Sequence, residues 1–197
     1  MAQHALLVVA HPRADSLTAQ IAQRARARLV DDGYTVDLLD LYAEDFDPRT
    51  GPEDEPDWAD RDKPYSPEAR SHMARIDTAD AIVVVFPVWW FGLPAILKGW
   101  IDRVWNYGFA YGRSSPRLGA KRMLWLGLSS YPREQFAELG WDAVMERQLR
   151  VGVSEFCGIK DASVEFVHDS LSVGPRGLAA ADTALAAFLG APAEPAK

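Results

Sequence analysis

Residues 81–94 have the sequence AIVVVFPVWWFGLP, and this stretch decides the fold. Its first part, 81–86, is apolar, uninterrupted and mostly β-branched, which is typical of a strand buried on both faces of a parallel sheet. Pro87 ends that strand. Pro94 then fits the first turn of a helix whose apolar stripe comprises Ile96, Leu97, Trp100, Ile101, Val104 and Trp105.

The same alternation of strand and helix continues on both sides of this stretch. Strands are predicted at 5–10, 35–41, 122–128 and 163–167, and helices from Leu17 to a stop at Gly33, from the Ser66-Pro67 cap, over 141–156 and over 177–189. This order predicts an α/β fold, a doubly wound five-stranded parallel sheet with helices on both faces. We expect one domain over residues 1–190 and a frayed tail over 191–197.

Composition narrows the class of protein. The chain has 197 residues, 48% of them hydrophobic and 25% charged, with a net charge of −7, so it is expected to be globular. The acidic balance disfavours nucleic acid as a partner, and no apolar run approaches the roughly 20 residues needed for membrane insertion. The single cysteine, Cys157, and the short N-terminal apolar run favour a cytoplasmic protein without a signal peptide.

One segment interrupts the alternation. Residues 44–63 carry nine acidic residues against three basic ones, with three prolines, and so hold nearly all the excess negative charge. Such a run favours a solvated insertion, at about residues 44–65, because like charges do not pack into cores. Trp58 and Tyr65 indicate that parts of it are anchored, which suits a wall of an active site or a subunit contact.

Ligands of a doubly wound sheet bind beyond the carboxyl ends of the strands, where the strand order reverses. The loop after the first strand lacks both the dinucleotide fingerprint and the phosphate-binding Walker sequence. Ser16 and Thr18 nevertheless place hydroxyls where the first helix exposes free N–H groups, and His11 and Arg13 add donors, which suits a single phosphate. A simple helix cap by Asp15 or Ser16 explains this loop equally well.

The loop at 88–93 carries a stronger signal. Three consecutive aromatic residues, Trp89, Trp90 and Phe91, follow a buried strand where a polar loop is the norm. Consecutive side chains diverge, so at least one aromatic face is expected to cover a flat ligand such as an isoalloxazine ring, while backbone N–H groups reach its heteroatoms. The alternative is that these aromatics only plug the strand end or form a dimer contact.

Other chemistries lack support in the sequence. The four histidines and Cys157 show no spacing typical of zinc ligands, so no metal is expected, and no serine lies in a G-x-S-x-G sequence. Cys157 is interpreted as a packed thiol. Lys98, Asp102 and Arg103 are expected on the solvated or salt-bridged face of their helix, and no side chain is assigned a catalytic role.

Three stretches together carry a family resemblance. These are FPVWWFGLPAILKGWIDRVWNYGFAY at 86–111, AHPRADSLTAQ at 10–20 and EFCGI at 155–159. They closely resemble the flavodoxin-like NAD(P)H:quinone oxidoreductase family of the DT-diaphorase type. The resemblance implies a flavodoxin-like five-stranded sheet, a tightly bound flavin, a homodimer with active sites at the subunit interface, and two-electron reduction of quinones or similar small planar acceptors by NAD(P)H.

The resemblance also assigns roles to residues of this chain. The flavin phosphate would lie near His11, Ser16, Leu17 and Thr18, and the isoalloxazine along Pro87, Val88, Trp89, Trp90 and Phe91. Tyr111 and Phe156 would line the acceptor pocket, partly from the neighbouring subunit. The third loop departs from the family, because Ser129, Ser130 and Tyr131 stand where the family has Thr-Thr-Gly-Gly, so contacts to the flavin pyrimidine must differ.

Several alternatives stay open. The insertion favours FAD as the cofactor, with FMN as the alternative. The electron donor is either NADH or NADPH. Because there is one nucleotide-type site, donor and acceptor are expected to share a pocket, which gives ping-pong kinetics. An electron carrier of flavodoxin type and a regulatory ancillary subunit of a potassium-efflux transporter are the competing functions.

Overall fold

The computed structural model describes residues 3–172 and 174–190, so the tail predicted at 191–197 lies outside the described residues. Its centre is a parallel sheet of five strands, as predicted, and the order of the strands is β2-β1-β3-β4-β5. The strands are β1 (Gln3–Val9), β2 (Tyr34–Asp40), β3 (Ala81–Pro87), β4 (Arg122–Leu128) and β5 (Asp161–Val167). The register is continuous, with Val85 level with Val9 on one side and Leu126 on the other.

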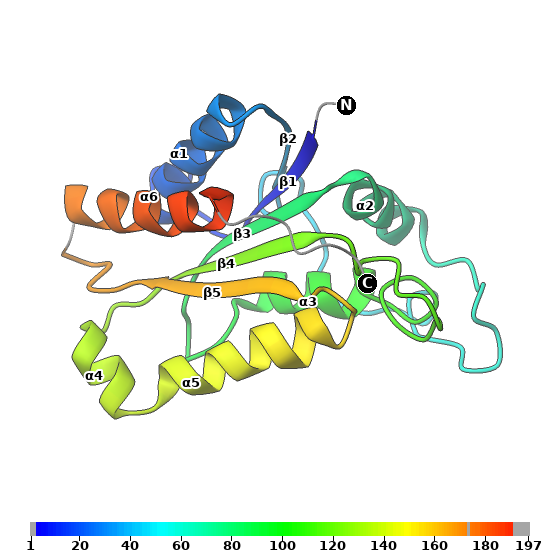
Figure 1. The fold of residues 1–197 in the computed structure, drawn as a ribbon. Helices are drawn as coiled ribbons and strands as arrows, with labels where there is room; N and C mark the ends of the chain where they lie inside the picture. The colour runs from blue at the N-terminus through cyan, green and yellow to red at the C-terminus, as the bar shows by residue number, and fades with distance from the viewer. Residues whose placement is uncertain (1–2, 173, 191–197) are drawn as a thin grey trace.

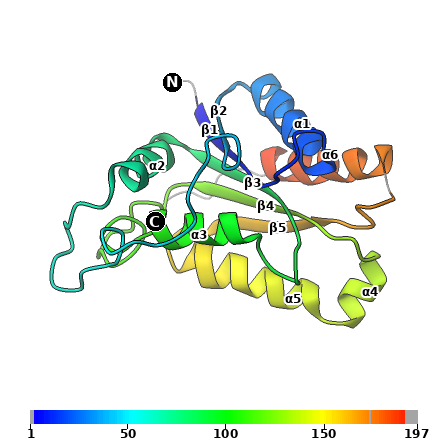
Figure 2. The same cartoon turned by 180° about the vertical axis from the view of Figure 1, so that it is seen from behind.

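Helices cover both faces of the sheet (Figures 1 and 2). They are α1 (Leu17–Asp31), α2 (Pro67–Thr78), α3 (Ala95–Val104), α4 (Arg133–Glu138), α5 (Trp141–Glu146), the π-helix η1 (Arg147–Glu155) and α6 (Pro175–Gly190). α1 and α6 share one apolar core with alternate residues of the central strands, such as Leu7 and Val83. The remaining helices share a second core with residues such as Leu6 and Trp125.

The helical segment between β4 and β5 differs from the prediction of one helix over 141–156. A separate short helix, α4, precedes it, and the predicted helix changes from α to π geometry at Arg147. Within the π-helix the hydroxyl of Ser154 donates to the carbonyl of Leu149, five residues earlier, and accepts the indole N–H of Trp125 at 3.0 Å. A buried side chain thus ties the wider turn to β4, which hydrophobic periodicity alone does not reveal.

The strand order reverses beside β1. Chain progression moves from β1 outward to β2, and then returns to the other side of β1 with β3. The loops that leave β1 and β3 at their carboxyl ends therefore diverge and border a crevice, which is where this class of fold binds ligands.

Candidate functional site

The loops that follow β1, β3 and β4 meet at the carboxyl end of the sheet. The rings of His11 and Trp89 lie with centroids 6.1 Å apart, which brings the first loop to the second. The N–H of Val88 donates to the carbonyl of Leu128 at 2.8 Å, which joins the second loop to the third. The structure therefore gathers at one edge the loop residues that the sequence singles out.

The start of α1 combines both interpretations of the first loop. Ser16 is the helix cap, because its Oγ accepts the N–H of Ala19 at 3.1 Å. The N–H groups of Leu17 and Thr18 meet no acceptor within residues 3–172 and 174–190. Free amides at the positive end of a helix dipole attract an anion, so the capped helix still offers a phosphate site.

The two basic residues of this loop are partly engaged. The Nδ1 of His11 accepts the N–H of Arg13 at 3.1 Å, which leaves Nε2 as the donor. Burial lowers the pKa of His11 below its usual 6.5, so the ring is neutral at pH 7. Arg13 pairs with Asp15 at 3.0 Å on the surface, so it brings less net positive charge to the loop than its sequence position suggests.

The second loop forms a tight turn on aromatic residues. Trp90 and Phe91 have φ values of 52° and 56°, and Trp89 and Gly92 exchange backbone hydrogen bonds of 3.1 and 3.0 Å. This is the geometry of a type I′ turn, which normally uses Asn and Gly. A left-handed conformation costs a residue other than glycine about 1–2 kcal/mol, so the turn holds strain in the place where the ligand is expected.

The strained turn leaves backbone donors free. Between Pro87 and Pro94, the amides of Val88, Trp89 and Gly92 donate to backbone carbonyls. The amides of Trp90, Phe91 and Leu93 find no acceptor among the residues that the structure describes. The loop therefore presents unused N–H groups next to its aromatic rings, an arrangement that suits the polar edge of a flat heterocycle.

The aromatic rings of this turn differ in their surroundings. Trp90 is 98% exposed and Trp89 is 40% exposed. Phe91 instead stacks on Trp141 of α5, with centroids 4.4 Å apart and planes inclined by 13°. The ring of Trp90 is thus available to a ligand, whereas Phe91 fixes the turn to the neighbouring helix.

In the third loop, Ser129 has a structural role. Its N–H donates to the carbonyl of Val167 at 2.9 Å, and its Oγ accepts the N–H of Tyr131 at 3.1 Å. Ser130 is exposed at the tip, and Tyr131 packs beside Phe91 with centroids 5.4 Å apart. Of the serine pair, Ser130 is the one whose side chain is free for a ligand.

Sequence reasoning missed two contributors to this edge. The sequence places Trp141 only at the start of a predicted helix, and in the structure its ring supports the turn of the second loop. The loop after β5 also joins the site, because the amides of Asp169 and Ser170 donate to the carbonyls of Tyr131 and Ser129 at 3.1 and 2.9 Å. Ligands of such sheets bind at the carboxyl ends of the strands, and this rule applies to β5 as well, so the loop after β5 could have been predicted to join the site.

Tyr111 and Phe156 lie close together, with ring centroids 5.3 Å apart, but away from the three loops. The segments that carry them lead into the starts of β4 and β5, and therefore lie at the opposite edge of the sheet. Trp58 of the insertion joins them, with its ring 5.0 Å from Tyr107 and 6.4 Å from Tyr111. Trp58 and Phe156 are 68% and 65% exposed, so this aromatic cluster faces outward.

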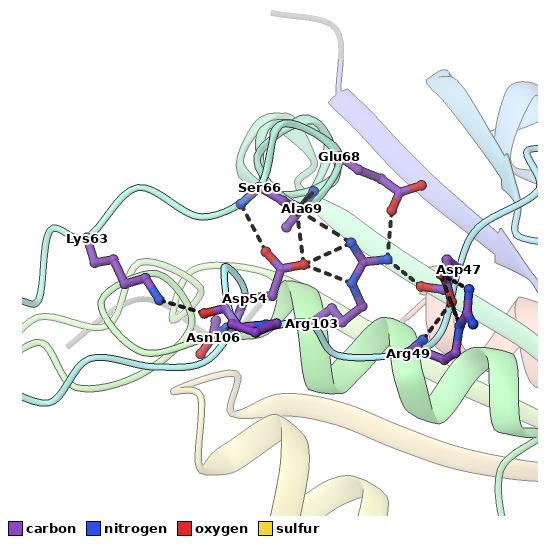
Figure 3. A network of polar contacts seen from close by, with 10 residues as sticks. Asp47, Arg49, Asp54, Lys63, Ser66, Glu68, Ala69, Arg103 and Asn106 are labelled. Atoms are coloured by element: carbon purple, nitrogen blue, oxygen red, sulfur yellow. Dashed lines mark hydrogen bonds and ion pairs between the residues drawn. The ribbon is translucent and has the colours of Figure 1, made fainter.

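The insertion is anchored through a buried ion pair, which corrects the expectation that its acidic side chains stay solvated (Figure 3). Asp54 of the acidic run is 1% exposed and pairs at 2.8 Å with Arg103, which is 6% exposed, so of the two faces expected for Arg103 the structure has the salt-bridged one. The Asp54 carboxylate also accepts the N–H and hydroxyl of Ser66, the cap of α2. Lys98 and Asp102 do form the expected surface pair, at 2.6 Å.

A glycine permits the insertion to lie against α3. A Cβ at Gly99 would lie 2.2 Å from the carbonyl oxygen of Pro48, a distance that no side chain tolerates. Tyr65 adds a second anchor, because its hydroxyl donates to the carbonyl of Tyr107 at 2.7 Å. Most residues of the insertion are nevertheless exposed, so it is a solvated segment held at defined points.

The donor set at the carboxyl edge fits a flavin nucleotide. Free amides at the start of α1 suit its phosphate, and the free amides of the second loop suit the carbonyl oxygens and nitrogens of its ring. The exposed indole of Trp90 offers a flat surface beside them. No cluster of metal-ligating side chains, and no helix long and apolar enough to span a bilayer, occurs within the described ranges.

Comparisons with known proteins agree with this fold. The model of a family with the flavodoxin-like fold matches residues 3–189. An uncharacterized NAD(P)H oxidoreductase of Escherichia coli, YcaK, is 43% identical over 165 residues, which cover 84% of this chain and 83% of the relative.

Two solved structures share the fold. An NAD(P)H:quinone oxidoreductase from Methanothermobacter marburgensis superposes with a TM-score of 0.84 at 24% identity, covering 96% of each chain. An FMN-dependent NADH-azoreductase from Bacillus anthracis, in complex with FMN, has a TM-score of 0.69 at 17% identity, covering 94% of this chain and 98% of its own. The chain therefore belongs to the flavodoxin-like family of NAD(P)H oxidoreductases.

Proposed function

We propose that this protein is a flavin-dependent NAD(P)H oxidoreductase that reduces quinones or similar planar acceptors by two electrons. The observation that carries the proposal is the strained turn at Trp90 and Phe91, which leaves free amides and one exposed indole at the switch point of the sheet. Strain of this kind persists where function requires it. When bound, a flavin supplies the redox chemistry, and the protein supplies binding, orientation and donors.

Each loop has a role in this proposal. The amides of Leu17 and Thr18, with His11 and Arg13 nearby, bind the flavin phosphate. Pro87, Val88 and Trp89 border the isoalloxazine, the amides of Trp90 and Phe91 donate to its polar edge, and Ser129, Ser130 and Tyr131 border its pyrimidine side.

The donor and the acceptor use one pocket in turn. The loop after β1 lacks a dinucleotide fingerprint, and the exposed face of Trp90 is the flat surface that a nicotinamide or a quinone can stack on. Sequential occupancy of one pocket gives ping-pong kinetics, with parallel lines in initial-rate plots against donor and acceptor.

A homodimer completes the pocket in this proposal. Tyr111, Phe156 and Trp58 form an outward-facing aromatic cluster at the edge of the sheet remote from Trp90. A second copy that places its cluster over the Trp90 turn would bury both aromatic surfaces and exclude water from the reacting rings.

FAD is the proposed cofactor and FMN the alternative. In the proposed dimer the insertion of the second copy comes to the Trp90 turn with its aromatic cluster and supplies a wall for an adenosine half, whereas the FMN named for the azoreductase neighbour supports the shorter nucleotide. We also propose a cytoplasmic location, since the only cysteine is a buried free thiol and NAD(P)H is an intracellular donor.

The test is purification followed by mass spectrometry of the released cofactor and assay of quinone reduction with NADH and NADPH. We expect a yellow protein that oxidises NADH or NADPH continuously only while a quinone is present as acceptor. A colourless protein that takes up neither FMN nor FAD contradicts the proposal. Bound flavin without turnover, together with co-purification of a membrane protein, would favour an ancillary subunit.

A further inference from the structure

A cavity of about 460 Å³ lies outside the loops discussed so far. It is bounded by α2, by the end of the insertion and by the segment between α3 and β4. α2 and that segment lead into the starts of β3 and β4, at the amino edge of the sheet (Figure 2). The cavity that they border therefore lies opposite to the Trp90 turn, which follows the carboxyl end of β3. Its size is within the range of sites for small organic ligands.

The cavity is strongly basic in an acidic protein. Five basic and two acidic side chains line it, which gives a net charge of +3, whereas the whole chain has −7. Arg113 and Arg117 form ion pairs with Asp62 and Asp77, which accounts for both acids. The remaining basic residues are Arg61, Lys63 and Arg70.

These remaining cations form no ion pair with the residues that the structure describes. Among the residues that the structure describes, the ammonium of Lys63 donates only to the backbone carbonyls of Pro52 and Glu55, at 3.3 and 2.6 Å, and has no carboxylate partner. Arg61 and Arg70 have neither an ion pair nor a side-chain hydrogen bond within the described part of the chain. Guanidinium groups without partners are suited to bidentate binding of a phosphate.

The floor of the cavity is apolar and partly aromatic. Tyr65, Met73 and Phe109 line it and are each less than 10% exposed. The guanidinium carbon of Arg117 lies 5.5 Å from the centroid of Phe109, and the ring of Tyr107 lines the wall. Such a floor can hold a planar ring beside the cationic rim.

We propose that this cavity binds a nucleotide, by contact of the base with the apolar floor and by ionic contacts of the phosphate with Arg61 and Arg70. A phosphate monoester carries about −1.5 to −2 charges at pH 7, which matches the excess positive charge better than a single carboxylate does. The site is separate from the proposed flavin site and goes beyond the proposed function. In the proposed dimer it would adjoin the aromatic cluster, since Tyr107 lines the cavity and its ring lies 5.0 Å from that of Trp58.

The experiment is isothermal titration calorimetry of AMP into the purified, flavin-loaded protein, with adenosine and benzene-1,2-dicarboxylate as comparison ligands. The test variant is Arg61→Gln/Arg70→Gln. The matched control is Arg26→Gln/Arg147→Gln, which removes the same charge from exposed arginines outside the cavity. Flavin absorbance and gel filtration check that the folding and assembly of each variant are unchanged. If the double variant Arg61→Gln/Arg70→Gln does not fold, the single variant Arg70→Gln is used in its place.

We expect AMP binding to weaken by about tenfold or more in the test variant and by less than about twofold in the control, and to weaken as salt is raised. Adenosine should bind much more weakly than AMP. Equal AMP affinity in the test variant and the unmodified protein would overturn the proposal, and so would absence of AMP binding. Tighter binding of the dicarboxylate than of AMP would refute the choice of a phosphate. If the purified protein takes up neither FMN nor FAD, the same titration is made on the flavin-free protein, and AMP binding there would contradict the proposed function alone.

Discussion

Phe91 and Trp141 stack almost in parallel, with ring centroids 4.4 Å apart, although fifty residues separate them in the chain. The contact joins the turn after β3 to the first residue of α5. It holds the turn that presents the free amides of Trp90 and Phe91, so Trp141 is a positioning residue for the proposed flavin site.

Replacement of Trp141 by alanine should loosen that turn. A stacked aromatic pair is worth about 0.5–1.5 kcal/mol beyond the area that it buries, so we expect flavin to bind roughly 2–10 times more weakly. Titration of the apoprotein with FMN and FAD, followed by flavin fluorescence, measures this. Trp141→Phe retains a stacking ring and should bind nearly as the unmodified protein does. Unchanged affinity in Trp141→Ala would show that the stack does not position the turn.

Replacement of Trp90 by asparagine should stabilise the protein and impair the enzyme. Trp90 is 98% exposed, so little packing is lost, and asparagine tolerates the left-handed φ of 52°. We expect about 1 kcal/mol of added stability in urea unfolding, with a lower kcat/KM for quinones. Trp90→Phe should leave the stability unchanged. A loss of stability in the asparagine variant would mean that the turn is not strained.

The sheet and its helices could be predicted from sequence because buried parallel strands such as 81–86 are continuous apolar runs. The three loops followed from the topology. Anchoring of the insertion was expected from Trp58 and Tyr65, but its buried ion pair was not, since nothing local marks Asp54, among nine acids, as the one that meets Arg103. That pairing spans 49 residues and depends on tertiary packing. The positive φ angles of Trp90 and Phe91 could not be predicted from sequence either, because aromatic residues are not typical of a type I′ turn.

The Asp54–Arg103 pair should contribute strongly to stability. Removal of one partner from a buried ion pair costs about 3–5 kcal/mol, and Arg103 keeps Glu68 at 2.7 Å as a second partner, so we expect a value near the lower limit for Asp54→Asn. Urea unfolding measures it. Asp57→Asn, at an exposed position of the same insertion, should change the stability by less than about 0.5 kcal/mol. Equal effects of the two substitutions would contradict the anchoring role.

Stability should fall on acidification through the titration of His72. The imidazole is 5% exposed, and its Nδ1 accepts the indole N–H of Trp100 at 3.0 Å. Burial, aided by the charge of Arg75, lowers the pKa of His72 below 6.5 in the folded state. The unfolded chain therefore takes up the proton first, so stability is full above about pH 6.5 and declines below it, toward the folded-state pKa.

Urea midpoints between about pH 7.5 and pH 5.5 test this dependence. His72→Gln, which keeps a hydrogen-bond acceptor, should show a shallower decline than the unmodified protein. His4→Gln, at an exposed histidine, should decline as the unmodified protein does. An identical decline in all three proteins would assign the effect to other groups.

Mixed dimers should distinguish a pocket built by two subunits from one built by a single chain. Trp90→Ala removes the ring at the carboxyl edge, and Phe156→Ala removes one from the aromatic cluster at the amino edge, so each homodimer should have low activity with quinones. If each pocket takes Trp90 from one subunit and Phe156 from the other, a heterodimer of the two variants has one intact pocket and one that lacks both rings. Random exchange of equal amounts makes half of the dimers mixed, which should restore about a quarter of the unmodified activity. Mixing that restores nothing, after exchange has been confirmed by mass spectrometry, would place both rings in pockets of a single chain and refute the shared site.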